Sequence, residues 1–405
     1  MEGSKLTREH DGKNAGELRQ DRYSIRTASQ WIGPVLEDVN SAYHQIVIEC
    51  NSVTDNPLTT PDGDIIHGGN FQAKAVTSAM EKTRQGFQSL GRILFAQCTE
   101  LINPATNNGL PPNLTADLPS ESFIMKGVDI LCASLLSELG FLANPVGSHV
   151  QTAEMGNQAL NSLALISARY THTAADLLSR LSAAHLLVVC QALDLRAMHS
   201  AFLALVEPPF HVLTSQVLGP ICKVPNMHSI LWPALLLALG GGTSEDPAAR
   251  FGSIASSLQS TILPLIDANK DSLSISLLFD WTNRVTALLC ESHESTLAAY
   301  LDRGDASPLL GRAARRMYLF VRKDLKVPFL HEKMLRASAP GSGDPELDAT
   351  VKPGHALTIG DHITVLHEAI RQGVLNVPVM EALKEARKAV ATECGETHHV
   401  RASAE

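Results

Sequence analysis

The chain has 405 residues, of which 44% are hydrophobic and 19% are charged. These proportions match soluble globular proteins, so they exclude an intrinsically disordered chain, a collagen and a small disulfide-rich scaffold. Lysine and arginine together number 33, against 42 aspartate and glutamate residues, giving a formal net charge of -9. Nucleic acids and anionic membranes are bound by concentrated positive charge, so neither is expected as a partner.

The seven cysteines are scattered singly, without the close pairs that zinc sites and redox motifs need. We expect them to be small buried residues in a reducing compartment, and we expect no metal site. The amino-terminal residues are polar, unlike a secretory signal. The most apolar stretch, 230–239, is interrupted by Pro233 and is shorter than the roughly 20 residues that span a bilayer. These features predict a cytoplasmic protein that does not cross a membrane.

The first half of the chain predicts long helices separated by polar loops. Residues 1–19 have the composition of a flexible lead, and apolar spacing then predicts helices over 31–50, 73–102 and 125–142. The loop between the first two helices is rich in Pro, Gly, Asp and Asn, and a small hairpin is expected around 61–63. A stretch without proline or glycine, 157–196, predicts a helix of about forty residues, which at ~1.5 Å per residue is about 60 Å long.

The second half continues the helical pattern with more interruptions. Prolines weaken the periodicity over 207–246, and helices are expected again over 251–268, 273–301, 309–325, 360–372 and 377–392. The fold class is therefore all-α, a bundle of long helices. We divide the chain into a flexible lead (1–19), a central helical bundle with active-site loops (20–206), a helical shielding region (207–336), a linker (337–359), terminal helices (360–392) and a tail (393–405).

Polar residues gather in four places, at 20–26, 51–56, 67–72 and 154–158. Tyr23 and Arg26 are three residues apart, so one helical turn would present both to a single ligand. Arginine binds a carboxylate through two parallel hydrogen bonds, which makes Arg26 a candidate anchor for a carboxylate substrate. Spacing alone favours a plainer interpretation, a surface arginine paired with Asp21 or Glu37.

Glu154, Asn157 and Gln158 could present one acid and two amides to a pocket from the expected start of the long helix. Ordinary helix capping explains the same three residues, because an acid is favoured in the first turn of a helix. No phosphate-binding loop and no Gly-x-Ser-x-Gly motif occurs in the sequence.

The four polar clusters belong to longer motifs that occur in a fixed order. These are the segments 20–27, 51–58, 67–72, 107–114 and 143–154. Together they closely resemble the carboxy-terminal portion of the aromatic amino acid ammonia-lyases (the phenylalanine/histidine ammonia-lyase family), particularly that of the phenylalanine ammonia-lyases. A weaker similarity continues through 191–196 and 317–322 to 379–384, so the resemblance covers roughly residues 20–390.

The resemblance implies a helical subunit of an oligomer whose active sites combine residues from three chains. The family eliminates ammonia from an aromatic amino acid and leaves a cinnamate-type acid. An electrophile is needed because the proton lost is weakly acidic and the amine is a poor leaving group. In this family the electrophile is a methylideneimidazolone prosthetic group that forms from an internal Ala-Ser-Gly.

The resemblance also implies roles for residues in the first three motifs. Arg26 would pair with the substrate carboxylate, and Tyr23 would place a catalytic hydroxyl near the prosthetic ring. Gln20 would supply a nearby hydrogen-bonding amide. Asn56 would help to hold the carboxylate, while Phe71 would pack beside the ring or the substrate.

In the fifth motif, the resemblance assigns Glu154 as the catalytic carboxylate that meets the substrate amine. Gln158 and Asn157 would supply supporting hydrogen bonds. The chain departs from the plant-type pattern here, because Gly156 stands where that pattern has a histidine and Ala159 where it has an aspartate.

The largest departure is that the chain contains no Ala-Ser-Gly. The ring-forming segment, a catalytic tyrosine loop and the aromatic selectivity pocket all precede the matched region in the family, so we expect the ring-forming domain to be missing. The first hypothesis is therefore an ammonia-lyase that is active only with a partner supplying the electrophile. The alternatives are an inactive scaffold or regulator, and a truncated lyase fragment. The aromatic substrate stays open among Phe, Tyr, His and others.

Overall fold

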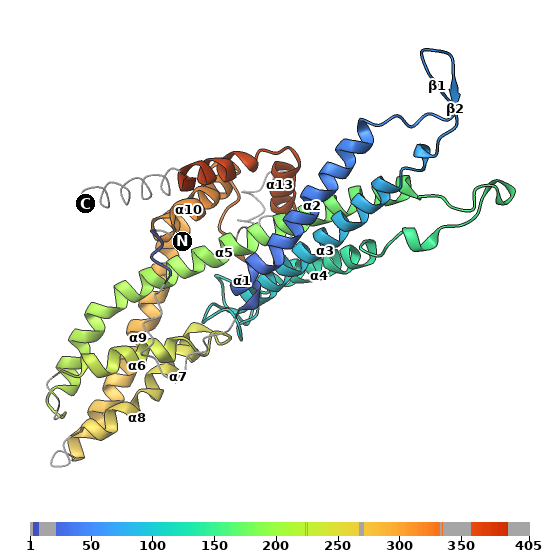
Figure 1. Cartoon of the computed structure of the whole chain (residues 1–405). Helices are drawn as coiled ribbons and strands as arrows, with labels where there is room; N and C mark the ends of the chain where they lie inside the picture. Colours follow the sequence, from blue (N-terminus) through green and yellow to red (C-terminus); the bar gives the residue numbers. More distant parts are fainter. Residues whose placement is uncertain are drawn as a thin grey trace, which may run out of the picture. The chain divides into compact units, whose positions relative to one another are not determined.

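The computed structural model describes residues 3–7, 22–222, 224, 226–266, 271–332, 334 and 358–387. Almost all regular structure in these residues is helical, with one two-stranded sheet (Figure 1). This confirms the predicted all-α bundle of long helices. The chain forms two compact units. The first unit comprises Gly12–Thr99 and Val128–His185, and the second comprises Met1–Asp11, Glu100–Gly127 and Leu186–Glu405. The domain boundaries suggested by the sequence stay predictions.

The first unit is a bundle of long helices. It contains the single turn α1 (Tyr23–Arg26), α2 (Ala28–Cys50), α3 (Lys74–Ile102), α4 (Lys126–Leu142) and the beginning of α5 (Ala164–Leu218). The three helices predicted by apolar spacing in this part are confirmed to within three residues at either end. A Cβ added at Gly91 would lie 2.8 Å from Leu139 Cδ1. Helices α3 and α4 therefore pack closely at this point, and a larger residue would require the Leu139 side chain to shift.

The loop between α2 and α3 contains the predicted hairpin. Strands β1 (Leu58–Thr59) and β2 (Ile65–Ile66) pair antiparallel, with Leu58 opposite Ile66. The turn uses Gly63 at a φ of 88°, a left-handed conformation that glycine adopts without steric cost. A short 3-10 helix, η1 (Asn70–Gln72), then leads into α3.

Helix α5 is longer than predicted and begins later. It runs from Ala164 to Leu218, which is 55 residues, rather than over 157–196. The helix continues through Pro208 and Pro209 although a proline inside a helix costs ~3 kcal/mol. Residues at helical spacing on both sides of the prolines are buried: Phe202, Val206, Phe210, Leu213 and Val217. Burial of this apolar face outweighs the cost of the two prolines, which had suggested that the helix would end before them.

By length and composition alone, α5 is apolar enough to cross a membrane. Half of its most apolar window is buried inside the structure, however. Leu181, Leu187 and Val188 are fully buried against other parts of the protein. Burial of this kind is what the core helix of a folded domain requires.

The second unit surrounds the later part of α5 with shorter helices. These are α6 (His228–Leu239), α7 (Pro247–Ser257), α8 (Gln259–Ile262), η5 (Leu263–Leu265) and α9 (Asp271–Arg303). The fully buried Trp281 lies at the centre of the apolar cluster that they form, and its Nε1 donates to Thr214 Oγ1 at 3.2 Å. The helix predicted over 251–268 is thus three shorter segments, because Leu258 and Pro264 interrupt it.

The remaining elements of the second unit are short. They are η2 (Pro112–Leu114), η7 (Ser307–Leu309), α10 (Arg312–Leu319), the π-helical turn η8 (Phe320–Asp324), α13 (Ile359–Arg371) and a helix over 376–387. The single helix expected over 309–325 is therefore divided among three elements. The terminal helices begin within one residue of their predicted positions. The predicted linker and tail fall almost wholly outside the described residues.

A buried carboxylate joins α5, α9 and α10 with η8. Asp194 is 1% exposed and accepts hydrogen bonds from Tyr300 Oη at 2.8 Å and Tyr318 Oη at 2.5 Å. It also accepts from Arg322 Nε at 2.9 Å and Nη2 at 2.5 Å. The weakly matching segments 191–196 and 317–322 therefore meet at this ion pair, which indicates that they hold the fold together.

The cysteines only partly follow the expectation of burial. Cys98, Cys132 and Cys190 are buried, but Cys50 is exposed and Cys222 and Cys290 are partly exposed. The exposure of Cys50 arises because it ends α2, where the chain leaves the bundle. Cys394 lies outside the described residues.

Candidate active site

Tyr23 and Arg26 lie on the single helical turn α1, as their spacing predicted. The backbone N–H of Arg26 donates to Arg22 O at 2.9 Å, which closes the turn. The Tyr23 side chain is 59% exposed, and Arg26 is exposed as well. Both side chains therefore lie at the surface. Gln20, the third residue assigned to this cluster, lies outside the described residues.

Two residues that the sequence did not single out hold α1 in place. Gln97 Nε2, on α3, donates to the carbonyl of Ser24 at 2.9 Å. His185 Nε2, on α5, lies 2.8 Å from Gln97 Oε1. Because that oxygen can only accept, Nε2 of His185 carries the proton. Burial lowers the pKa of His185 to about 4, so the ring is neutral near pH 7.

Asn56 and Phe71 lie in the loop between α2 and α3. Asn56 Oδ1 accepts from the backbone N–H of Gly68 at 3.2 Å, so this side chain ties the two sides of the loop together. Asn70 Nδ2 donates to Val53 O at 2.7 Å and does the same. The ring of Phe71 is 48% exposed. The loop therefore holds a large aromatic surface at its end without burying it.

Glu154 lies at the tip of the loop between α4 and α5, in the 3-10 turn η4 (Glu154–Gly156). Its Oε2 accepts from Asn157 Nδ2 at 2.9 Å. The expected position of these residues at the start of the long helix is wrong. Gln158 pairs with Ala153 through two backbone hydrogen bonds of 2.9 and 3.2 Å, which closes the tip as a small loop before α5 begins.

The backbone at this tip is strained. Glu154 and Met155 have φ values of 51° and 54°, in the left-handed region that residues with a Cβ seldom occupy. Gly156 has a φ of 89°, a conformation that suits glycine. Gly156, one of the two residues that depart from the plant-type pattern, is therefore the residue type that suits this backbone conformation. Strain of this kind persists only where the surrounding structure fixes the chain.

Helix α3 supplies that support to both ends of the loop. Glu81 Oε1 accepts from the backbone N–H groups of Val146 and Gly147, both at 2.7 Å. At the other end, Gln72 Nε2 donates to Leu160 O at 3.1 Å and Thr77 Oγ1 donates to Ser162 O at 2.6 Å. The loop that carries Glu154 is thus fixed to one rigid helix on both sides.

Arg84 extends this support into the core of the first unit. It is fully buried and its guanidinium donates to the carbonyls of Leu142 and Ser167, at 2.7 and 2.8 Å. It also contacts the hydroxyls of Ser167 and Thr171. Burial lowers the pKa of Arg84, while the nearby Glu81 opposes that shift. In the sequence Arg84 is one of several charged residues of α3, so neither its burial nor the backbone carbonyls that it binds could be predicted.

Within the first unit the candidate residues form two groups rather than one. Tyr23 and Arg26 precede α2, whereas Asn56, Phe71 and the linked Glu154 loop follow it at the far end (Figure 1). Helix α2 has 23 residues, which is a length of about 34 Å, and it lies between the two groups. A single copy of the chain does not bring Arg26 together with Asn56 and Glu154.

Comparisons with known proteins agree with this fold. The family model "Aromatic amino acid lyase" matches residues 1–208. Phenylalanine ammonia-lyase 2 of Pleurotus ostreatus is 43% identical over 382 residues, covering 90% of this chain and 49% of that protein. A phenylalanine aminomutase (L-beta-phenylalanine forming) of Talaromyces islandicus is 41% identical over 92% of this chain.

A solved structure gives the same result. The crystal structure of phenylalanine ammonia-lyase from the yeast Rhodosporidium toruloides superposes with a TM-score of 0.83 at 36% identity, covering 94% of this chain and 56% of that one. The chain belongs to the aromatic amino acid lyase family. It is similar to the phenylalanine ammonia-lyases, and it spans about half the length of the curated relatives that it matches.

Proposed function

We propose that this chain forms part of a cytoplasmic, phenylalanine ammonia-lyase-like enzyme that removes ammonia from an aromatic amino acid to give a cinnamate-type acid. The proposal depends above all on one observation: the carboxylate-binding and amine-binding motifs of the family are present and exposed. Within these 405 residues, the groups for holding the substrate are present. The group that activates it comes from elsewhere.

The residues of this chain would bind and orient the substrate. The planar guanidinium of Arg26 matches a carboxylate through two hydrogen bonds, and the amide of Asn56 would hold the same carboxylate. Glu154 would accept hydrogen bonds from the substrate amine. Phe71 would pack against the aromatic ring. Holding both ends of the amino acid fixes the Cα–Cβ bond in one orientation, which is the positioning that elimination needs.

The separation of these groups by α2 supports a site shared among copies of the chain. Helix α2 buries only Val35 and Ala42, although it is 23 residues long. Large apolar side chains along it are exposed, among them Leu36 at 62%, Tyr43 at 64% and Ile48 at 68%. Soluble monomers seldom leave an apolar face of this kind uncovered. We infer that other copies cover α2, and that Arg26 of one copy then meets Glu154 of another.

The methylideneimidazolone group of the family does not fit these 405 residues. Three Ala-Ser pairs in the described part lie inside helices, at 28–29, 133–134 and 255–256, and are followed by Gln, Leu and Ser. A fourth, Ala306-Ser307, is followed by Pro308 and enters η7. None has the glycine that ring formation requires. The electrophile would come from a segment outside this sequence, on the same longer polypeptide or on a second one.

Complementation tests the proposal directly. The chain would be co-expressed with the part of the Pleurotus ostreatus relative that it does not match, and ammonia and cinnamate would be measured after co-purification. We expect activity that Arg26→Gln and Glu154→Gln each reduce by at least about 100-fold, as the loss of a charged binding partner does. The control is Arg180→Gln, an exposed arginine paired with Asp176. A stable, folded complex without activity would refute the proposal.

The same assay separates the competing functions. The 41% identity to an aminomutase favours one alternative product, so the reaction would also be analysed for β-phenylalanine. A non-catalytic scaffold would bind full-length lyases equally well with and without the Arg26→Gln and Glu154→Gln changes. A truncated fragment would aggregate when purified alone and would gain no activity from any partner.

A further inference from the structure

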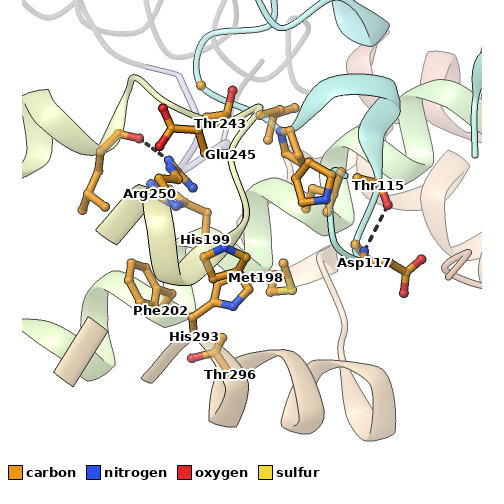
Figure 2. Close-up of a pocket in the computed structure, with 18 of the residues that line it drawn as sticks. Thr115, Asp117, Met198, His199, Phe202, Thr243, Glu245, Arg250, His293 and Thr296 are labelled. Carbon is orange, nitrogen blue, oxygen red and sulfur yellow. Dashed lines mark hydrogen bonds between the residues drawn. The ribbon is translucent and has the colours of Figure 1, made fainter. Parts of the chain in front are cut away.

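The second unit contains a cavity that the proposed lyase site does not use. It is lined by the segment 109–119 and by residues of α5, α7 and α9, and its volume is about 80 Å³. His199, Phe202 and His293 lie close together at the cavity (Figure 2), and Phe251 also lines it. The rings of Phe202 and Phe251 are stacked at 5.8 Å, and His293 meets their edges at 6.1 and 5.6 Å. We call this space the His199–His293 cavity.

Several polar groups around the cavity have no partner within the described residues. These groups are the ring nitrogens of His199 and His293 and the hydroxyl of Thr243, which is 8% exposed. His199 and His293 are only partly buried, so their ring nitrogens can be reached from the cavity. Other polar side chains of this unit are engaged within the fold. Gln191, for example, donates to Leu114 O and Leu330 O and accepts from Leu330 N. The groups at the cavity are therefore available to a ligand that enters it.

The charge at the cavity comes from Arg250. Its Nε and Nη2 donate to the carbonyls of Gly241 and Leu239 at 3.2 and 2.5 Å, which leaves Nη1 to face other groups. No carboxylate in the described part of the chain forms an ion pair with Arg250. Glu245 also lines the cavity but is exposed to solvent, and its negative charge opposes the lowering of the Arg250 pKa that burial causes. Asp117 is already engaged, because its Oδ2 accepts from Glu332 N at 2.6 Å.

The histidines add hydrogen-bond donors rather than charge. Burial lowers the pKa of His199 to about 4, with further contributions from the charges of Arg196 and Arg250. Burial, and then Arg250, lower the pKa of His293 in the same direction. Near neutral pH each ring is uncharged and carries one N–H. The interior therefore offers one cation and several neutral donors beside an aromatic wall.

We propose that the His199–His293 cavity binds a small monocarboxylate, with its oxygens toward Arg250 and the histidine N–H groups and its alkyl end against Phe202 and Phe251. A single guanidinium balances one negative charge, which argues against a phosphate dianion. The volume is about half of the ~150 Å³ that accommodates benzene, so a molecule of acetate size fits and an aromatic acid does not. This proposal is independent of the lyase function.

The probe is acetate, titrated into the full chain carrying isotope-labelled histidine rings, at neutral pH and with chloride replaced to keep the ionic strength constant. Two of the 16 histidines should give ring signals that shift and saturate. Arg250→Gln should weaken binding at least about tenfold through loss of the charged partner. Arg180→Gln, which removes an exposed arginine in the other unit, should change nothing.

His293→Phe preserves the aromatic wall and removes only the ring nitrogens. It therefore tests acetate binding in the cavity even if Arg250→Gln does not fold. It should remove one of the two shifting signals and weaken the response of the other. A response that stays linear in acetate, that chloride reproduces, or that both variants retain would overturn the proposal. A linear response, or one that both variants retain, would mean that acetate does not bind in the cavity, and a response that chloride reproduces would mean that the site does not select a carboxylate.

Discussion

Removal of the Asp194 carboxylate is the most severe single change that the structure allows us to predict for stability. Asp194 and Arg322 form an ion pair whose side chains are 2% and 7% exposed. The carboxylate also accepts hydrogen bonds from the hydroxyls of Tyr300 and Tyr318. Burial, and then the negative charge of Asp194, raise the pKa of both tyrosines. Asp194→Ala would leave the guanidinium of Arg322 and both hydroxyls without their acceptor.

The expected cost follows from this burial. Breaking a buried pair by removing one partner costs roughly 3 to 5 kcal/mol, because an uncompensated charge stays inside. Replacing both partners with apolar residues of similar size is often close to neutral. The double variant Asp194→Leu with Arg322→Met should therefore recover the part of the loss that comes from the unpaired guanidinium, while the hydroxyls of Tyr300 and Tyr318 still lack their acceptor. Asp176→Ala, which breaks the exposed pair with Arg180, should cost about 0.5 kcal/mol or less.

Urea unfolding followed by circular dichroism would measure these differences for the wild type and the variants. The decisive comparison is between the single and the double variant. If Asp194→Ala costs no more than the exposed control, the carboxylate is not the link between α5, α9 and η8. If the double variant is less stable than Asp194→Ala, the stability does not depend on leaving a buried charge unpaired, and the reasoning is wrong.

Three further predictions concern the first unit. Glu81→Gln, which keeps the shape but loses the charge, should speed hydrogen exchange at residues 143–163 while exchange in α4 stays unchanged; equal exchange in both proteins would mean that Glu81 does not hold the Glu154 loop. Because burial lowers the pKa of His185 to about 4 from its ordinary 6.5, the unfolded chain binds that proton more tightly. Stability should therefore be complete above about pH 6.5 and fall as the pH drops from there toward 4. His185→Gln should reduce that fall in acid-unfolding curves, and His44→Gln, at an exposed position, should not. Tyr43→Lys on the exposed face of α2 should lower the oligomer mass seen by analytical ultracentrifugation, whereas an unchanged mass would show that α2 is not covered by another copy.

The helices of the first unit were predictable because their apolar residues recur at helical spacing over long stretches. The errors arose where proline and loop signals competed with burial. Pro208 and Pro209 suggested an ending, but Phe202 and Phe210 are buried on the same face and α5 continues through. The absence of proline and glycine over 157–196 suggested a helix beginning near Glu154, but the pairing of Ala153 with Gln158 closes a loop there and α5 begins at Ala164. In each case a contact between residues decided the local structure.

The candidate site, too, could be predicted from the sequence only in part. The motifs around Arg26 and Glu154 could be found in the sequence because their residue types and order are unusual. The side chains that hold these motifs in place could not be found in the sequence, because Gln97 and Glu81 look like ordinary polar residues of a long helix. Their importance comes from the backbone atoms that they bind, Ser24 O and the N–H groups of Val146 and Gly147.

By itself, the sequence determined the helical class, most helix positions and the resemblance to the aromatic amino acid lyases, because periodicity and motif order are local properties of the chain. Only the tertiary structure decided that Arg26 and the loop carrying Glu154 lie toward opposite ends of α2, a helix about 34 Å long (Figure 1). It also decided that the Glu154 loop is fixed to α3, and that His199, Arg250 and His293 meet at one cavity. These arrangements depend on side chains far apart in sequence packing against each other, and no spacing along the chain records such contacts.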